Sequence, residues 1–264
     1  MDLQLKNKKT LVTGSTAGIG FAIAQLLAAE GAEVIINGRK KEDVEEVVST
    51  IRKDTSNDKV KGIAADFSKA DEVKNLIAQL PELDILINNV GIFNEVDFEE
   101  TSDEEWFEIF EVNVMSGVRL ARYYFPQMLK KNEGRIIFIS SESALNIPTE
   151  MIHYGMTKTA QLSVSRGLAR LSKGTNVTVN AVLPGPTLSR ANLAGLEEEA
   201  EKAGKSLDEV KTAFFEERRP TSLIQRFADI EEVASMVAYV ASPLSSATNG
   251  AALRVDGGVV NAIF

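Results

Sequence analysis

Three residues in the middle of the chain have the types and spacing of an acid/base site. Tyr154 and Lys158 are four positions apart, so on a helix the phenol and the ammonium lie one turn apart on the same face. A free phenol titrates near pH ~10, and a neighbouring cation favours its ionised form, which makes it usable as a general acid/base. Ser141 lies thirteen residues before Tyr154, at the carboxyl end of the apolar run 135–139. Because a Tyr-x-x-x-Lys spacing alone is weak evidence, the interpretation depends on whether the chain also binds a cofactor.

A glycine-rich turn near the amino terminus is the candidate cofactor site. An apolar strand is expected at 10–13, and apolar residues at helical spacing begin at Ala22. Glycines between them let the backbone approach a pyrophosphate closely, and the helix offers free N–H groups and the positive end of its dipole. This order predicts a dinucleotide site, whose candidate residues in the turn are Gly14, Ser15, Thr16, Gly18, Ile19 and Gly20.

Arg39 suggests which dinucleotide binds. A site for NAD usually has an acidic side chain about 20 residues after the glycines, where it holds the ribose 2′-hydroxyl. Arg39 stands there instead, and a guanidinium can donate a forked pair of hydrogen bonds to the 2′-phosphate of NADP. The sequence therefore favours NADP, with NAD as the alternative. The alternative interpretation of Arg39 is an ordinary surface residue at the start of the next helix, beside Lys40 and Lys41.

Strand and helix patterns alternate along the whole chain. This alternation predicts an α/β fold in which residues 1–264 form one domain, a doubly wound parallel sheet with helices on both faces and the ligand at the carboxyl ends of the strands. About seven strands are expected, at 10–13, 33–39, 60–65, 84–87, 135–139, 177–182 and 251–255.

Composition and charge exclude several classes of protein. A net charge of −9 disfavours nucleic-acid and anionic-membrane surfaces, and no apolar run is long enough for a signal peptide or a membrane span. The chain has no cysteine and a single histidine, which excludes disulfides, thiol chemistry and multi-histidine metal sites. His153 should point about 100° away from Tyr154 and lie at the rim of the site. A soluble cytoplasmic protein is expected.

Three further features have two interpretations each. Asn88 and Asn89 end a strand, where amides can contact a ligand or tie neighbouring strands together. Asn113 lies within a long helix expected over 102–128, and asparagine there needs a reason, which a solvent-facing position would also supply. The charged segment 189–226 is either a substrate lid or a solvated helical pair.

Taken together, these motifs resemble the classical short-chain dehydrogenases/reductases, whose fold is Rossmann-like. The match in order and spacing spans nearly the whole chain and consists of the turn 13–20, Asp66, the run 88–91, Asn113, Ser141, Tyr154 with Lys158, and Pro184 with Gly185. Two positions differ from the common pattern. Val90 replaces a more usual alanine, and Thr16 stands where many NADP-dependent members carry a basic residue.

The resemblance implies a role for each matching residue. Tyr154 would be the general acid/base, Lys158 would lower its pKa and hold the nicotinamide ribose, and Ser141 would polarise the substrate oxygen. Asn113 would hold a water in a proton relay. Asp66 and Phe67 would contact the adenine, Asn89 and Gly91 the adjoining ribose, and Pro184, Gly185 and Thr187 the nicotinamide side.

The function expected on this basis is an NADP-dependent oxidoreductase acting on a small-molecule ketone or secondary alcohol. Two alternatives are an epimerase or dehydratase that keeps the nicotinamide, and a dinucleotide-binding regulator without chemistry. A regulator would be expected to have lost Tyr154 or Lys158, and both are present. The resemblance also implies a homotetramer joined partly through the two long helices.

Overall fold

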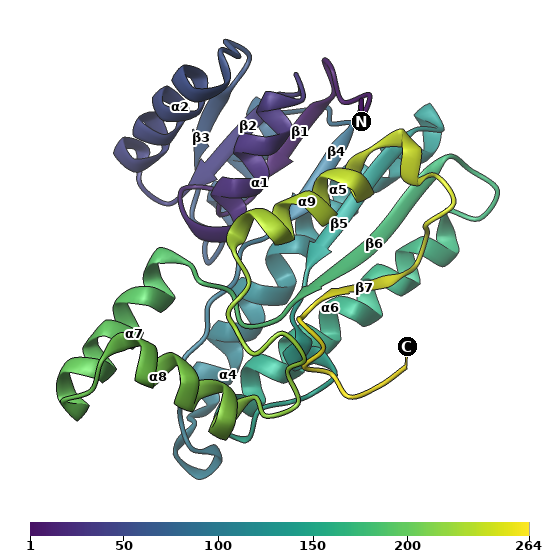
Figure 1. Ribbon diagram of the computed structural model, residues 1–264. Coiled ribbons are helices and arrows are strands. Elements are labelled where there is room, and N and C mark those ends of the chain that lie inside the picture. The colour runs from purple at the N-terminus through teal and green to yellow at the C-terminus, as the bar shows by residue number, and fades with distance from the viewer. Residues whose placement is uncertain (264) are drawn as a thin grey trace.

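A single parallel sheet forms the centre of the molecule in the computed structural model, which describes residues 1–263 (Figure 1). Within these residues the sheet has seven strands in the order β3-β2-β1-β4-β5-β6-β7, and every neighbouring pair is parallel. This confirms the predicted doubly wound sheet. The strands are β1 (Lys9–Val12), β2 (Glu33–Gly38), β3 (Lys61–Ala64), β4 (Ile85–Asn88), β5 (Gly134–Ile139), β6 (Val177–Pro184) and β7 (Ala252–Val255).

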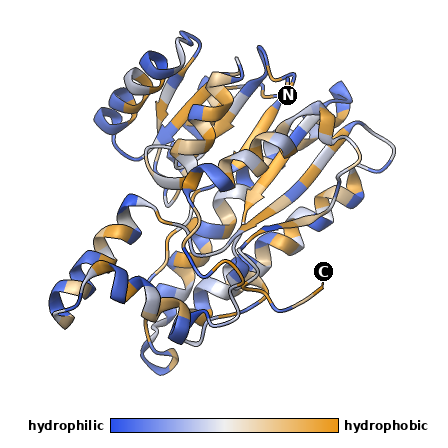
Figure 2. Ribbon diagram, in the orientation of Figure 1, coloured by the Kyte–Doolittle hydropathy of each residue, from blue (hydrophilic) through white to orange (hydrophobic). Residues whose placement is uncertain are grey.

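Helices cover both faces of the sheet, because successive strand residues point to opposite sides and both sides are apolar. Leu11 packs in the layer that contains α3 (Ala70–Gln79), α5 (Ser116–Lys131) and α6 (Ile152–Leu171). Its neighbour Val12 packs in the opposite layer, which contains α1 (Gly18–Ala29), α2 (Lys41–Thr55) and α9 (Ile230–Ala241). Figure 2 shows the apolar strands between helices whose outer faces are hydrophilic. The remaining α-helices are α4 (Asp103–Phe110), α7 (Arg190–Ala203) and α8 (Leu207–Ala213).

The single long helix expected over 102–128 is interrupted. Its start is as predicted, because Ser102 and Glu105 form a capping box at the beginning of α4. A π-helical turn, Glu111–Met115, then separates α4 from α5. Such turns insert an extra residue and are found frequently at functional sites. Here the turn carries Asn113, so the departure from regular helix falls at one of the predicted site residues.

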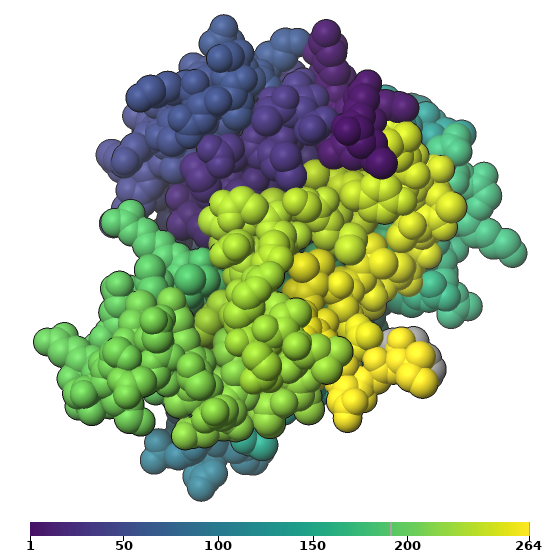
Figure 3. Space-filling view, viewed as in Figure 1, coloured from purple at the N-terminus to yellow at the C-terminus, as the bar shows by residue number. Residues whose placement is uncertain are grey.

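The 189–226 segment lies outside the two main layers (Figure 1). It contains α7 and α8, which pack on each other through a small cluster of Leu196, Ala200 and Val210. The chain then returns to the sheet, where Ala228 pairs with Thr187 in an isolated parallel bridge. Figure 3 shows this segment in green, projecting at one end of the molecule beside the yellow carboxyl-terminal region. Among residues 1–263, no helix combines the length and apolar character needed to cross a bilayer.

Candidate active site

The glycine turn connects β1 to α1 in the geometry that an anionic ligand needs. Gly14 and Gly18 have φ angles of +60° and +56°, a conformation that side chains with a Cβ rarely adopt. A Cβ at Gly20 would lie 2.4 Å from the main-chain oxygen of Gly14, so this close approach requires glycine. Ala17 precedes α1 in extended conformation and offers no side-chain cap, which leaves the N–H groups of the first helical turn available to a ligand.

Two asparagines from neighbouring strands hold this turn in place. The side chain of Asn37, in β2, accepts a hydrogen bond from the Gly14 N–H (3.1 Å), and the Asn37 main chain bonds to Ser15 in both directions. Asn89, after β4, donates from Nδ2 to the main-chain oxygens of Thr13 (2.9 Å) and Gly14 (3.0 Å). Asn89 is therefore a tie between strands, one of its two expected roles, while its contact with a ribose stays a prediction. Asn37 was not identified from the sequence, because only the register of β1 on β2 brings it to the turn.

The end of β2 lies against Thr16 of the glycine turn. A Cβ at Gly38 would lie 2.5 Å from Cγ2 of Thr16, so Thr16 covers the last residue of the strand, and exposed Arg39 follows directly. Asp66, after β3, is half-buried and accepts two hydrogen bonds from Ser68. Burial works against ionisation of Asp66, but these bonds and the charges of Lys69 and Arg39 outweigh it and lower its pKa.

Phe67 is buried in the core layer formed by α3 and α5. Its ring does not face solvent, so the predicted contact of Phe67 with an adenine would have to come from its main chain. Pro184 ends β6, and a Cβ at Gly185 would lie 2.7 Å from the main chain of Asp256, which makes glycine necessary there. Thr187 is buried and donates from Oγ1 to the Gly185 oxygen (2.9 Å).

Ser141, Tyr154 and Lys158 meet at the carboxyl end of β5. Ser141 follows Ser140, whose hydroxyl donates to the main-chain oxygen of Lys158 (2.9 Å) and so joins the end of β5 to α6. The Lys158 Nζ lies 5.5 Å from the centre of the Tyr154 ring, as the four-residue spacing predicts. It donates to the main-chain oxygen of Ile139 (3.0 Å), and its side chain is buried. The structure thus brings the three predicted residues together.

Burial sets the proton affinities of this pair. Burial raises the pKa of Tyr154 to about 12, with a smaller opposing effect from Ser141 and a further raising effect from the Glu142 charge. Burial also lowers the pKa of Lys158 to about 8. The sequence predicts that Lys158 lowers the pKa of Tyr154, whereas in the structure desolvation of the phenolate outweighs any such effect. Tyr154 therefore holds its proton at neutral pH.

Asn113 is fully buried, so the solvent-facing interpretation of this residue is wrong. Its side chain accepts from the N–H of Ile92 (2.7 Å) and donates to the Ile92 oxygen (2.9 Å) and to the Thr157 hydroxyl (3.0 Å). Gln161, on α6, donates from Nε2 to the main-chain oxygen of Asn113 (2.6 Å), and Lys158 Nζ lies 3.5 Å from Gln161 Oε1. Gln161 therefore connects Lys158 to Asn113. Sequence reasoning missed Gln161, although its position three residues after Lys158 on the same helix was a usable signal.

The two hydrogen bonds between the Asn113 side chain and Ile92, in the loop after β4, also position Gly91. A Cβ at Gly91 would lie 3.3 Å from Lys158 Nζ and 3.5 Å from Asn113 Oδ1, so the backbone passes close to both groups. Apolar side chains lie nearby at the surface. Phe93, 58% exposed, meets the edge of the Tyr154 ring at 5.9 Å between ring centres. Leu145 and Ile147 are about half exposed in the loop that leads from Ser141 to Tyr154.

His153 is not a rim residue, contrary to expectation. Its side chain is buried, with Nε2 2.9 Å from Oδ1 of Asn94 and the ring packed edge-on against Trp106. Burial lowers the pKa of His153, so the imidazole is neutral near neutral pH. Among the described residues, no group of three or more His, Asp or Glu side chains could hold a metal ion.

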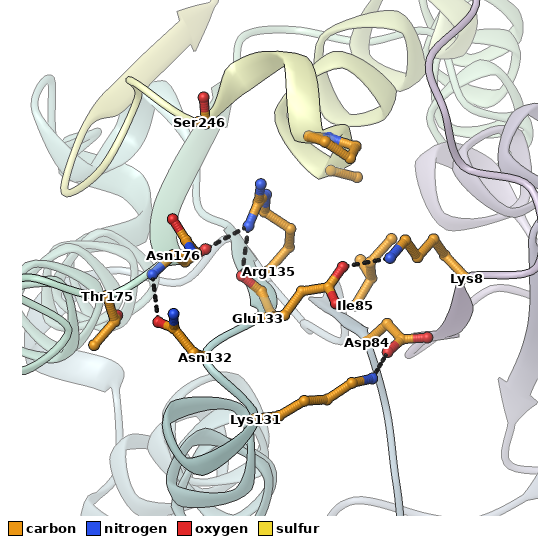
Figure 4. A pocket seen from close by; sticks show the side chains of 13 residues that line it. Lys8, Asp84, Ile85, Lys131, Asn132, Glu133, Arg135, Thr175, Asn176 and Ser246 are labelled. Carbon is orange, nitrogen blue, oxygen red and sulfur yellow. Dashed lines mark hydrogen bonds and ion pairs between the residues drawn. The ribbon is translucent and has the colours of Figure 1, made fainter.

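A cavity of about 400 Å³ lies at the opposite ends of the strands (Figure 4). It is lined by the residues that begin β1, β4, β5 and β6, with ion pairs between Lys8 and Glu133 and between Lys131 and Asp84. Arg135 donates from Nη1 to the main-chain oxygens of Gly134 and Asn176, both at 2.9 Å. These contacts join the amino ends of neighbouring strands, and none of the predicted site residues lines this cavity.

Comparisons with known proteins agree with this geometry. Residues 8–201 match the family model described as short chain dehydrogenase. The chain is 48% identical over 264 residues to the uncharacterized oxidoreductase YvaG of Bacillus subtilis (strain 168), and the match covers all of both chains. It is 31% identical over 260 residues to D-beta-hydroxybutyrate dehydrogenase of Cupriavidus necator, covering 97% of this chain and 99% of that protein.

A solved structure shows the same fold with ligands. The L-sorbose reductase from Gluconobacter frateurii, complexed with NADPH and L-sorbose, superimposes with a TM-score of 0.92 at 28% identity, and the match covers all of both chains. The match to the family model and the full-length similarity to these oxidoreductases confirm the resemblance seen in the motifs. The chain therefore belongs to the short-chain dehydrogenase/reductase family, as an oxidoreductase of the classical type.

Proposed function

We propose that this protein is an NADPH-dependent reductase of ketones, in which Tyr154 gives a proton to the substrate oxygen. The observation that carries the proposal is the buried Lys158 ammonium 5.5 Å from the centre of the Tyr154 ring, at the end of β5 next to Ser141. A phenol with a pKa of about 12 stays protonated at neutral pH, so Tyr154 is suited to donate a proton. In the direction of carbonyl reduction, Tyr154 is then the proton donor.

The glycine turn fits a dinucleotide. Its positive φ angles, the close approach at Gly20 and the free N–H groups at the start of α1 together form a cradle for a pyrophosphate. When bound, a nicotinamide cofactor supplies the hydride. The residues that we expect to hold it are Gly14, Ser15, Thr16, Gly18, Ile19 and Gly20 at the pyrophosphate, Asp66, Phe67, Asn89 and Gly91 at the adenosine, and Lys158, Pro184, Gly185 and Thr187 at the nicotinamide.

NADP is the favoured form of the cofactor because of the charge at the end of β2. Arg39 is exposed there, directly after the strand, and Thr16 packs against Gly38, the last residue of the strand. Both can donate hydrogen bonds to a 2′-phosphate, and Arg39 also neutralises its charge. The sorbose reductase of the same fold binds NADPH, which supports this assignment.

Each side chain of the site would have a distinct role in carbonyl reduction. The Ser141 hydroxyl donates to the substrate oxygen and polarises the carbonyl, and Tyr154 transfers its proton to the same oxygen. The Lys158 ammonium, held by the Ile139 oxygen, stabilises the phenolate that Tyr154 becomes. Asn113 and Gln161 fix the position of Lys158 from the other side and connect it to the relay that returns a proton.

The surface around Tyr154 indicates which part of a substrate it can accommodate. Phe93, Leu145 and Ile147 present apolar area next to the reacting groups, so we expect the carbonyl to carry an apolar or ring-shaped substituent. The segment 189–226 is proposed as the substrate lid.

A screen tests this function directly. Purified protein is incubated with ketones, ketoses and 3-oxo esters, and NADPH oxidation is followed at 340 nm beside NADH oxidation. We expect turnover of at least one carbonyl class with NADPH, and a loss of kcat of about 10³-fold in Tyr154→Phe, within the range that general acid catalysis supplies. Full activity in Tyr154→Phe would contradict the assignment.

A homotetramer is also proposed, as the family resemblance implies. Phe107 on α4, Tyr123 on α5 and Leu171 at the end of α6 are exposed, by 74%, 38% and 68%. Light scattering coupled to size-exclusion chromatography would give the mass, which for a tetramer is four times the 28.7 kDa of one chain.

A further inference from the structure

A buried ion pair joins the 189–226 segment to the residue that follows Ser141. The Arg219 Nε donates to Oε1 of Glu142 at 2.9 Å. Glu142 is 3% exposed and Arg219 is 8% exposed, so both charges are largely removed from water. Burial raises the pKa of Glu142, and the Arg219 charge opposes that effect.

Arg219 contacts both ends of the loop that leads from Ser141 to Tyr154. Its Nη1 donates to the main-chain oxygen of Arg218 (2.8 Å) and lies 3.8 Å from Oε1 of Glu150. Glu142 and Glu150 lie near the two ends of the loop that leads from Ser141 to Tyr154. One guanidinium of the segment therefore interacts with carboxylates at both ends of this loop.

The neighbouring arginine extends the connection to the loop after β4. Arg218 lies between Glu95 (3.7 Å) and Glu199 (3.8 Å), and Glu199 belongs to α7. Both arginines stand at the end of α8, where the helix finishes in the π-helical turn Phe214–Arg218. A π-helical turn is an irregularity found frequently at functional sites. Here the turn places Arg218 and Arg219 so that each interacts with two glutamates.

Stability alone does not explain a buried pair in this place. Removing two charges from water costs about as much as their attraction returns, so a buried ion pair is weak evidence for stability but can fix one arrangement of the chain. The Oε2 atom of Glu142 is buried without a hydrogen-bond partner, which adds to the cost. Because this cost in folding free energy falls on the residue next to Ser141, we interpret the ion pair as a device that fixes the position of the loop.

We propose that Glu142 and Arg219 are a positioning pair that holds the 189–226 segment against the loop between Ser141 and Tyr154. The part of this proposal that concerns substrate rests on the proposed function. By keeping the segment closed over the loop, the pair sets where a substrate lies relative to the Ser141 and Tyr154 hydroxyls. It acts through those residues and takes no part in proton or hydride transfer.

The test uses the full-length protein and three variants of the pair. Arg219→Met removes the charge but keeps the alkyl chain, Arg219→Lys keeps the charge but not the planar fork, and the double variant Glu142→Gln/Arg219→Met removes both charges. Arg226→Met is the matched control, because Arg226 is an exposed arginine of the same segment paired with Glu232 on α9. Amide hydrogen exchange, thermal unfolding and steady-state kinetics are measured for each.

Arg219→Met should raise hydrogen exchange in 207–218 by about tenfold and leave 230–241 unchanged, because the loss is a local opening. KM for the carbonyl should rise about tenfold while kcat falls less, and Arg219→Lys should recover part of that loss. The double variant should recover Tm, since no unpaired charge remains buried, yet keep the raised exchange and the raised KM. Arg226→Met should behave like the parent protein.

Three outcomes would overturn the proposal. Exchange in Arg219→Met could equal that of Arg226→Met, it could rise equally across the sheet, or the double variant could return exchange and KM to the parental values. The exchange and Tm measurements need no substrate. If the parent protein reduces no carbonyl, the proposed function fails on its own, and the exchange data still decide whether the pair holds the segment.

Discussion

The side-chain amide of Gln161 donates a hydrogen bond of 2.6 Å to the main-chain oxygen of Asn113, inside the turn where α4 and α5 are separated. All the groups involved are buried, and Gln161 Oε1 also faces Lys158 Nζ at 3.5 Å. The family resemblance assigns a water to Asn113. The Gln161 amide lies between Lys158 and the Asn113 main chain, so it is next to the place where that water would bind. A carbonyl oxygen has two lone pairs, so it can accept a second hydrogen bond beside that of Gln161.

Changing Gln161 to leucine should lower kcat about tenfold or more, because the Asn113 oxygen and Lys158 both lose a buried partner. KM for the cofactor and for the carbonyl should change much less, since Gln161 touches neither site directly. Gln79→Leu is the control, because Gln79 is an exposed glutamine whose amide also donates to a main-chain oxygen. Equal kinetics for both variants would show that Gln161 is only a core residue.

The activity should depend on the proton carried by Lys158. Its pKa is lowered by burial to about 8, so the ammonium is lost as the pH rises through that value. Because the charged form stabilises the phenolate, kcat/KM for reduction should be level below pH ~7 and fall about tenfold per pH unit above ~8. The Tyr154 pKa of about 12 is too high to cause this fall. In Lys158→Arg, whose side chain stays charged, the remaining activity should not fall over this range.

Arg39→Ala should raise KM for NADPH about tenfold or more and leave KM for NADH nearly unchanged, since only NADPH carries the 2′-phosphate. Lys40→Ala serves as the control, because Lys40 is also exposed and is adjacent to Arg39. Kinetics with both cofactors give the comparison. An equal loss for NADPH and NADH would mean that Arg39 acts through general surface charge.

Two glycine substitutions should have opposite effects on stability. A Cβ at Gly20 would lie 2.4 Å from the Gly14 oxygen, so Gly20→Ala should destabilise the fold by about 1–3 kcal/mol and weaken cofactor binding. At Gly167, inside α6, a Cβ would meet no atom within 4 Å, so Gly167→Ala should stabilise the protein by about 1 kcal/mol. Thermal unfolding of both variants checks the pair. A stable Gly20→Ala variant that still binds NADPH would show that the turn can relax.

Much of the architecture followed from local patterns. The alternation of apolar strands with amphipathic helices predicted the parallel sheet, and the glycine turn between β1 and α1 appears where expected. Tyr154 and Lys158 face each other because both lie on one helix, where a four-residue spacing has a single geometric consequence. Patterns of this kind depend only on residues close in the chain.

The rest depends on contacts between residues far apart in sequence, which only the packing of the elements determines. Asn37 reaches the glycine turn through the register of two strands, and Arg219 reaches Glu142 through the return of the 189–226 segment. The burial of His153 follows from its neighbours Asn94 and Trp106. The pKa of Tyr154 was expected to fall and instead rises, because the sequence names its charged neighbour but does not show how far the fold shields the phenol from water.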